Sequence, residues 1–168
     1  MKYIALVSVL VACTLIIAGT ANASQPPAPK GQFSLTTTLV TGFDGSFVGG
    51  GLVGGALVVP TGKGAFIRFL GNGGVLNPTG TTKVVGTLRT TVLVGAPLSK
   101  RFTVLTGAGL TFLFPPSGGV DVTPVGVVSL GFNLGRGIGV FFPTAVTKKG
   151  IVWNCEFVLT FPDPNKKS

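Results

Sequence analysis

The sequence predicts an all-β protein: an eight-stranded antiparallel up-and-down transmembrane β-barrel with short turns, preceded by a cleaved signal peptide. From residue 33 to residue 161, stretches of roughly ten residues alternate between apolar and small or polar side chains. Short turn segments separate these stretches, and an export signal precedes them. Hairpin-linked strands of this length suit a membrane barrel, because closure pairs the backbone amides that lipid cannot satisfy.

The first 23 residues have the features of a signal peptide. Lys2 supplies a positive charge, residues 4–18 form an apolar run, and residues 21–23 match an A-x-A cleavage box. The apolar run is shorter than the roughly twenty residues of a membrane-spanning helix, so we expect cleavage rather than an uncleaved anchor. Lipoprotein processing at Cys13 is an alternative, although the apolar run continues beyond that residue.

The rest of the chain is long enough for one domain. We expect residues 24–32 to be an extended proline-rich lead-in, residues 33–161 the barrel, and residues 162–168 a C-terminal tail. Only Cys155 would survive cleavage, which predicts no internal disulfide. We expect Cys155 to face lipid, with an intermolecular bridge as the alternative.

The chain is strongly basic, with a formal net charge of +9. Such a charge is typical of nucleic-acid binding. Here the export signal opposes that interpretation, and the basic residues lie singly or in pairs at turns, as at Lys100 and Arg101. Turn residues of a barrel would lie among anionic headgroups. We therefore expect outer-membrane lipid as the partner, and no nucleic acid.

The clearest alternation runs through residues 120–134. One face carries Val120, Val122, Val128, Leu130, Phe132 and Leu134, and the other carries Asp121, Thr123, Ser129, Gly131 and Asn133. Residues 82–94, 102–114 and 151–161 alternate similarly, and Cys155 falls on the apolar face of the last. A period of two predicts strands with distinct faces.

Seven turn segments predict eight strands. They are residues 44–45, 61–64, 77–80, 96–100, 115–119, 135–137 and 147–150. We expect the first, third, fifth and seventh on the outer side of the membrane and the others in the periplasm.

Alternation alone does not say which face is inside. Three features favour an apolar face toward lipid: phenylalanines near strand ends, small or polar residues on the opposite face, and an aromatic end to the last strand. Inward glycines would fit the narrow interior of an eight-stranded barrel. The alternatives are a secreted soluble β-sandwich or lipocalin-like carrier of a small apolar ligand, and a self-assembling matrix protein based on the Gly- and Val-rich residues 48–59.

Three segments, residues 96–110, 131–137 and 153–161, resemble the small eight-stranded bacterial outer-membrane β-barrel proteins over roughly residues 31 to 161. The resemblance implies a monomer in the outer membrane, with a structural or envelope-maintaining role. It also implies that Trp153, Phe157, Leu159 and Phe161 form a C-terminal signal for the barrel-assembly machinery. In two respects the chain departs from the family: phenylalanine must replace tyrosine and tryptophan at the membrane interfaces, and no outer loop is long.

The composition opposes catalysis. The chain has no histidine, which excludes Ser-His hydrolysis and removes the commonest zinc ligand. Its four carboxylates are dispersed, and its glycine-rich segments 49–55 and 71–74 lack the lysine and helix of a phosphate-binding loop. We expect a protein that is not an enzyme and that uses no cofactor or metal.

Five charged residues are predicted to face the barrel interior: Arg68, Lys83, Arg89, Asp121 and Glu156. A buried charge requires a partner, so we expect a salt-bridge network that plugs the lumen. Two alternatives remain open. One is a narrow gated pore that opens when Glu156 and an arginine separate, and the other is a small hydrophobic ligand held by Leu105, Leu113, Val125 and Val127.

Overall fold

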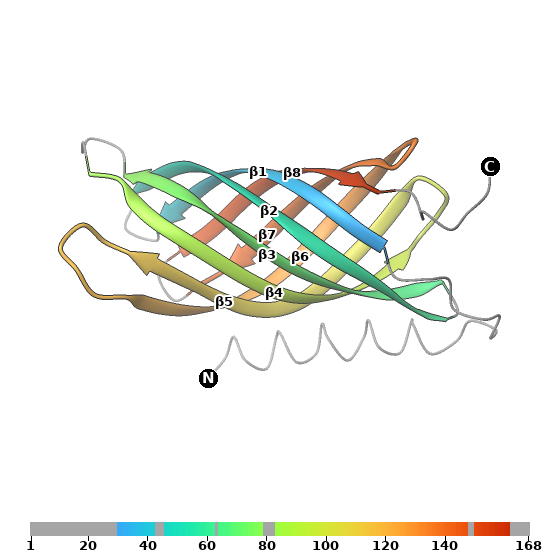
Figure 1. The fold of residues 1–168 in the computed structure, drawn as a ribbon, viewed down its shortest axis with the longest axis horizontal. Coiled ribbons are helices and arrows are strands. Elements are labelled where there is room, and N and C mark those ends of the chain that lie inside the picture. The colour runs from blue at the N-terminus through green and yellow to red at the C-terminus, as the bar shows by residue number, and fades with distance from the viewer. Residues whose placement is uncertain (1–29, 43–45, 63, 79–82, 148–149, 162–168) are drawn as a thin grey trace.

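The computed structural model describes residues 30–42, 46–62, 64–78, 83–147 and 150–161, which form a closed barrel of eight antiparallel strands (Figure 1). Each strand pairs with the next, and β1 pairs with β8 to complete the ring. The strands are β1 (Lys30–Gly42), β2 (Phe47–Gly62), β3 (Ala65–Pro78), β4 (Val85–Pro97), β5 (Phe102–Phe114), β6 (Asp121–Gly135), β7 (Ile138–Val146) and β8 (Gly150–Thr160). The predicted eight-stranded up-and-down fold is confirmed.

The barrel begins slightly earlier than the sequence predicts. Strand β1 starts at Lys30, so residues 30–32 of the expected lead-in belong to the wall. Gln32 pairs with Ala56 of β2 and with Thr160 of β8. The expected signal peptide, the rest of the lead-in and the expected C-terminal tail lie outside the described residues.

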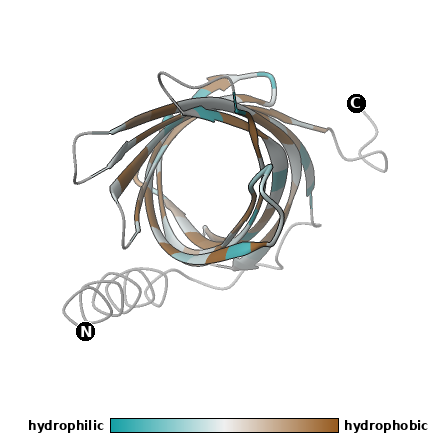
Figure 2. Ribbon diagram, turned by 90° about the vertical axis from the view of Figure 1, so that its left-hand side faces the viewer, coloured by the Kyte–Doolittle hydropathy of each residue, from teal (hydrophilic) through white to brown (hydrophobic). Residues whose placement is uncertain are grey.

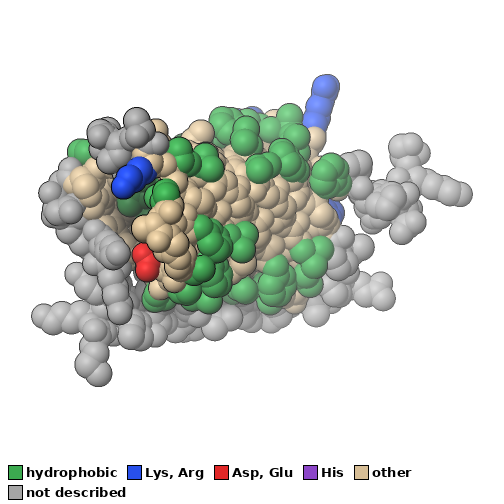
Figure 3. Space-filling view, turned by 60° about the vertical axis from the view of Figure 1, so that its left-hand side comes forward, with side chains coloured by type: hydrophobic (Ala, Val, Ile, Leu, Met, Phe, Trp, Pro, Cys, Tyr) green, Lys and Arg blue, Asp and Glu red, His purple; other side chains and the backbone are tan. Residues whose placement is uncertain are grey.

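The two faces of the wall differ as the alternation predicts. In β6, Val122, Val128 and Leu130 are exposed on the outside, whereas Val125 and Ser129 are buried inside. Seen along its axis, the barrel is a complete ring (Figure 2). Hydrophobic side chains spread over the visible wall in Figure 3, and the coloured charged side chains lie toward its two ends. The apolar side chains therefore face outward, as in a barrel surrounded by lipid.

Inward glycines allow the wall to curve tightly. A Cβ atom added at any of Gly50, Gly54, Gly74, Gly107 and Gly109 would overlap the backbone of a neighbouring strand. Glycine at such positions lets the sheet bend and close. The glycines of residues 49–55 do not all serve this purpose, because Gly49, Gly51 and Gly55 alternate with the inward pair and lie on the outer face.

Two phenylalanine rings cover glycines on adjacent strands inside the barrel. Phe66 of β3 is the register partner of Gly95 of β4, and a Cβ at Gly95 would meet its ring. Phe141 of β7 lies over Gly131 of β6 in the same way. Each ring fills the volume that the glycine leaves, so the two residues together fix the local register.

Both ends of the outer wall carry aromatic side chains. Phe47, Phe114 and Trp153 are exposed toward the end that holds the β1–β2, β3–β4, β5–β6 and β7–β8 connections. Phe33, Phe102 and Phe161 are exposed toward the other end, where β1 starts and β8 finishes. No helix among the described residues is long and apolar enough to cross a membrane.

Candidate functional site

A buried ion pair crosses part of the barrel interior. Arg68 of β3 donates to both carboxylate oxygens of Glu156 of β8, at 2.9 Å to Oε2 and 2.7 Å to Oε1. Both side chains are 1% exposed. Two-point pairing of this kind is the strongest arrangement that arginine and a carboxylate can form, and here it joins β3 to β8 across the intervening β1 and β2.

Further contacts hold Arg68 in place. Its Nε donates to Gln32 Oε1 at 2.9 Å, and Gln32 Nε2 donates to Thr160 Oγ1 at 3.0 Å. The guanidinium also lies 5.1 Å from the ring centroid of Phe141, within the range of a cation–π interaction. Arg68 therefore meets a carboxylate, an amide and an aromatic face, which compensates for its removal from water.

Arg89 of β4 reaches to the opposite side of the barrel. Its Nη1 donates to Asn154 Oδ1 on β8 at 3.2 Å. The same oxygen accepts from Thr38 Oγ1 at 2.9 Å, and Asn154 Nδ2 donates to the Pro143 carbonyl at 2.9 Å. Since β4 and β8 lie four strands apart in a ring of eight, this contact spans the lumen.

Of the five charged residues predicted inside the barrel, the structure buries Arg68, Arg89 and Glu156 in the interior. Lys83 and Asp121 are both exposed, so they are not among the buried charges of the interior. Lys83 precedes β4, and Asp121 is the first residue of β6. Both residues fall on the inward-facing side of the alternation, but they lie at or just before the start of a strand, where they are exposed.

Many interior polar atoms have no protein partner. Among the described residues, the buried side-chain atoms without a hydrogen bond are Ser34 Oγ, Thr36 Oγ1, Asn72 Oδ1, Thr87 Oγ1, Arg89 Nε, Thr91 Oγ1, Thr111 Oγ1 and Ser129 Oγ. A buried polar group without a partner costs free energy. Because these atoms lie on the inner face, the polar part of the lumen is the candidate functional site. Alternation predicted a polar inner face, but not which of its groups would lack partners.

A second part of the interior is apolar. Leu93, Leu105, Val125, Val127, Ala145 and Val152, from β4 to β8, form one buried cluster. Of the four residues expected to line a hydrophobic ligand site, Leu105, Val125 and Val127 pack within this cluster, and Leu113 is only partly buried and lies outside it. In the structure these side chains contact one another as a core.

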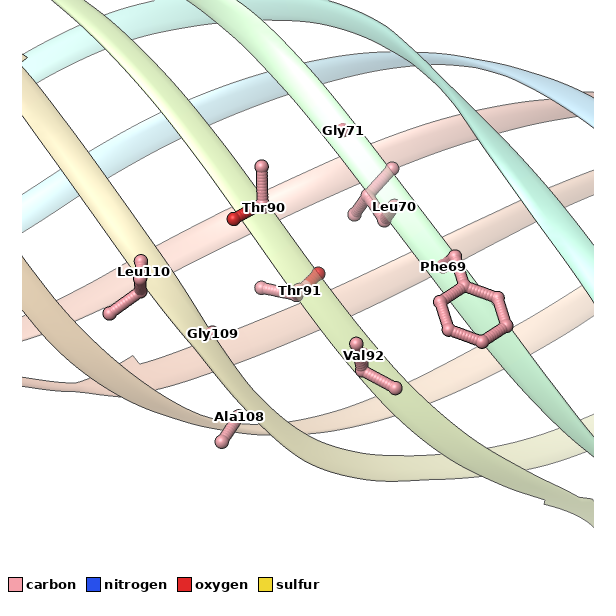
Figure 4. Close-up of a pocket in the computed structure, with 9 residues that line it drawn as sticks. All are labelled: Phe69, Leu70, Gly71, Thr90, Thr91, Val92, Ala108, Gly109 and Leu110. Carbon is pink, nitrogen blue, oxygen red and sulfur yellow. The ribbon is translucent and has the colours of Figure 1, made fainter.

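A shallow hollow of about 500 Å³ lies over β3, β4 and β5 (Figure 4). The residues that line it include Phe69, Gly71, Val92, Ala108 and Leu110. A Cβ added at Gly71 would meet nothing within 4 Å. The hollow is part of the apolar outer surface and contains no charged side chain.

The residues of the expected assembly signal lie along the outer face of β8. Trp153, Phe157, Leu159 and Phe161 are 48%, 51%, 49% and 57% exposed. Phe161 follows the strand, and its amide donates to the Gly31 carbonyl at 3.0 Å. Cys155 lies among them on the same face, is partly exposed and forms no disulfide.

The described residues contain no group of three or more His, Cys, Asp or Glu side chains able to hold a metal ion. The arrangement of the lumen therefore offers charge pairing and hydrogen bonding, through two arginines, one carboxylate and a set of hydroxyl groups.

Comparison with known proteins supports the fold and leaves the family open. No protein-family model matches the chain, and no curated protein matches it. A solved structure described as "De novo design of transmembrane beta-barrels" is similar, with a TM-score of 0.50 and 9% identity over 82% of this chain and 100% of the designed one. At this identity the likeness concerns the eight-stranded barrel fold alone.

Proposed function

We propose that the chain is a bacterial outer-membrane β-barrel, monomeric and not an enzyme, with a structural or envelope-maintaining role and a lumen plugged by its own side chains. The observation that carries the proposal is the apolar outer wall. Each strand places large apolar side chains on this wall, for example Leu35, Val92 and Phe157. In water such a continuous apolar surface would favour aggregation, whereas a lipid bilayer solvates it.

Closure and end aromatics support the same proposal. A barrel has no unpaired strand edge, which meets the requirement that every backbone amide in hydrocarbon have a partner. Exposed phenylalanines and Trp153 near both ends match the positions that aromatic residues take at membrane interfaces.

The side chains that occupy the lumen favour a structural role over that of a channel for free diffusion. The Arg68–Glu156 pair and the Arg89–Asn154 contact cross the interior, and the apolar cluster fills the side between β4 and β8. A narrow gated pore is the second candidate, favoured by the unpartnered polar atoms around Arg89.

The barrel-assembly machinery is the proposed partner during biogenesis. The outer face of β8 presents Trp153, Phe157, Leu159 and Phe161 beside the β1–β8 seam. We expect Phe161→Ala to lower the amount of folded barrel in cells while leaving refolding of the purified chain into detergent unchanged. Equal cellular yields of folded protein would argue against recognition of this residue.

Heat modifiability on a gel tests the membrane assignment. The chain without residues 1–23 is refolded in detergent and, separately, in buffer, and each sample is run with and without boiling. We expect an SDS-resistant band that shifts on boiling and forms only with detergent. A soluble, monodisperse protein in plain buffer would contradict the proposal and favour the carrier of an apolar ligand.

A further inference from the structure

We propose that Arg89 is the centre of a binding site for a small inorganic anion of the size of chloride inside the barrel. The site consists of Arg89 and the four inward-facing positions next to it in the strand register: Asn72, Thr87, Thr91 and Thr111.

The buried charges of the described interior do not balance. Among the described residues, the buried charged side chains are Arg68, Arg89 and Glu156. Glu156 is committed to Arg68 through both of its oxygens, whereas Arg89 contacts the neutral amide of Asn154. Two positive charges and one negative charge leave the described interior with a net charge of +1. A buried charge without compensation is strongly unfavourable.

The strand register places polar residues next to Arg89 on the inner wall. Asn72 of β3 and Thr111 of β5 are the partners of Arg89 on its two neighbouring strands. Thr87 and Thr91 are the adjacent inward positions on β4 itself, since side chains on one face recur every second residue. Every one of these four side chains is at least nine-tenths buried. Polar side chains thus flank the base of the Arg89 side chain on all four sides of the inner wall, while its Nη1 reaches Asn154 on β8.

Within the part of the chain that the structure describes, each polar side chain next to Arg89 has a buried atom that lacks a hydrogen-bond partner. Thr87 Oγ1, Thr91 Oγ1, Thr111 Oγ1 and Asn72 Oδ1 have no partner among the described residues, and neither does Arg89 Nε. The hydroxyl groups and the guanidinium N–H are donors, and the Asn72 amide becomes one when its side chain turns over. Unpartnered donors beside position 89 on the inner wall, together with the unpartnered Arg89 Nε and an unbalanced positive charge, match an anion. Water would satisfy these hydrogen bonds but would leave the charge uncompensated.

This inference goes beyond the proposed structural role and needs only the folded barrel. It is tested in detergent if the protein is a membrane barrel and in buffer if it is soluble. Failure of the membrane assignment would therefore leave the anion site open to measurement, and the two results are distinguishable.

The experiment replaces sodium gluconate by sodium chloride at constant ionic strength and measures urea unfolding by the fluorescence of Trp153. At a chloride concentration ten times the dissociation constant, the unfolding equilibrium constant is expected to fall about elevenfold. Arg89→Gln is expected to abolish this dependence and, with its charge removed, to fold in gluconate at least as stably as the parent. Arg101→Gln is the matched control, since Arg101 is exposed in the turn after β4, and it should keep the full chloride response.

A second variant and a direct measurement cover the case in which Arg89→Gln does not fold. Thr111→Val keeps the charge and the side-chain volume but removes one donor, and it should weaken the chloride response severalfold. Crystals grown in sodium bromide should show an anomalous peak beside the Arg89 guanidinium. Identical unfolding of the parent protein in chloride and gluconate, an undiminished response in Thr111→Val, or bromide at surface sites only would each overturn the proposal.

Discussion

Arg68 and Glu156 belong to strands that are separated by two others around the wall, yet their side chains meet through two hydrogen bonds of 2.9 Å and 2.7 Å. The pair acts as a strut within the barrel, because it connects β3 to β8 independently of the backbone ladder. It also uses the only carboxylate that the structure places in the described interior.

Removing one partner of this pair should therefore be costly. Glu156→Gln leaves two buried arginines without a carboxylate, and we expect it to lower the free energy of unfolding by about 3–5 kcal/mol. Urea titration in lipid vesicles, followed by Trp153 fluorescence, gives the value. Asp121→Asn is the control, since this carboxylate is exposed at the start of β6, and it should change stability by less than about 0.5 kcal/mol. An equal loss in the two variants would contradict a special role for the buried pair.

Charge on the outer wall should be penalised only within the membrane. Val92 is 49% exposed near the middle of β4, and Leu98 is 61% exposed in the following turn. We expect Val92→Arg to cost about 2–4 kcal/mol in a bilayer and Leu98→Arg about 0–1 kcal/mol. Unfolding in vesicles measures both. If Val92→Arg is as mild as Leu98→Arg, the outer wall does not face hydrocarbon.

A single methyl group added at Gly131 should lower the stability of the barrel, because the ring of Phe141 covers this position. A Cβ at residue 131 would meet the ring of Phe141, so we expect Gly131→Ala to cost about 1–3 kcal/mol through displacement of the ring. Gly71→Ala is the matched control, because its Cβ would lie in open space on the outer face. Adding Phe141→Leu to Gly131→Ala should recover part of the loss. A neutral Gly131→Ala variant would show that the ring moves aside freely.

Cys155 should react slowly with polar reagents in the folded protein. It lies on the apolar outer face of β8, where detergent or lipid would exclude a charged, water-soluble maleimide. We expect labelling in micelles to be at least tenfold slower than in urea. The comparison protein is Ser99→Cys in a Cys155→Ser background, since Ser99 is exposed in a turn. Fast labelling of folded Cys155 would place it in water.

Period-two alternation was sufficient to predict the strands and their faces. Within β6 the large apolar side chains Val122, Val128 and Leu130 are exposed on the outer face, and Ser129 and Gly131 are buried on the inner face, as predicted. Asp121 and Asn133, near the two ends of the strand, are exposed. Arg68, Arg89 and Glu156 lie inside, as their places in the alternation predict. Alternation shows which face a residue belongs to, but it does not show where a strand ends. Lys83 and Asp121 alternate with the outward residues, yet they lie at or just before the start of a strand and are exposed.

The partners of the interior charges could not be predicted in the same way. The Arg68–Glu156 and Arg89–Asn154 contacts depend on the stagger of strands around the ring, which residues from distant parts of the sequence determine together. Gln32 was expected in the lead-in and not in a strand, so its contact with Arg68 was not predicted. Asn154 is a neutral amide, so no charge gave a reason to pair it with Arg89. The inward glycines were predicted in part, since only closure shows which of them touch a neighbouring backbone.

The seam between β1 and β8 determines when this protein can fold. Gln32 and Thr160, which bond to each other across the seam, are 128 residues apart in the chain. Until the last strand has been synthesised, any partial sheet has two open edges that can pair with other chains. Folding during synthesis would therefore expose the protein to aggregation, and the chain must remain unfolded until its C-terminal strand is available. Loss of even a few residues from β8 should consequently affect the yield of the whole barrel, and not merely the stability of one strand.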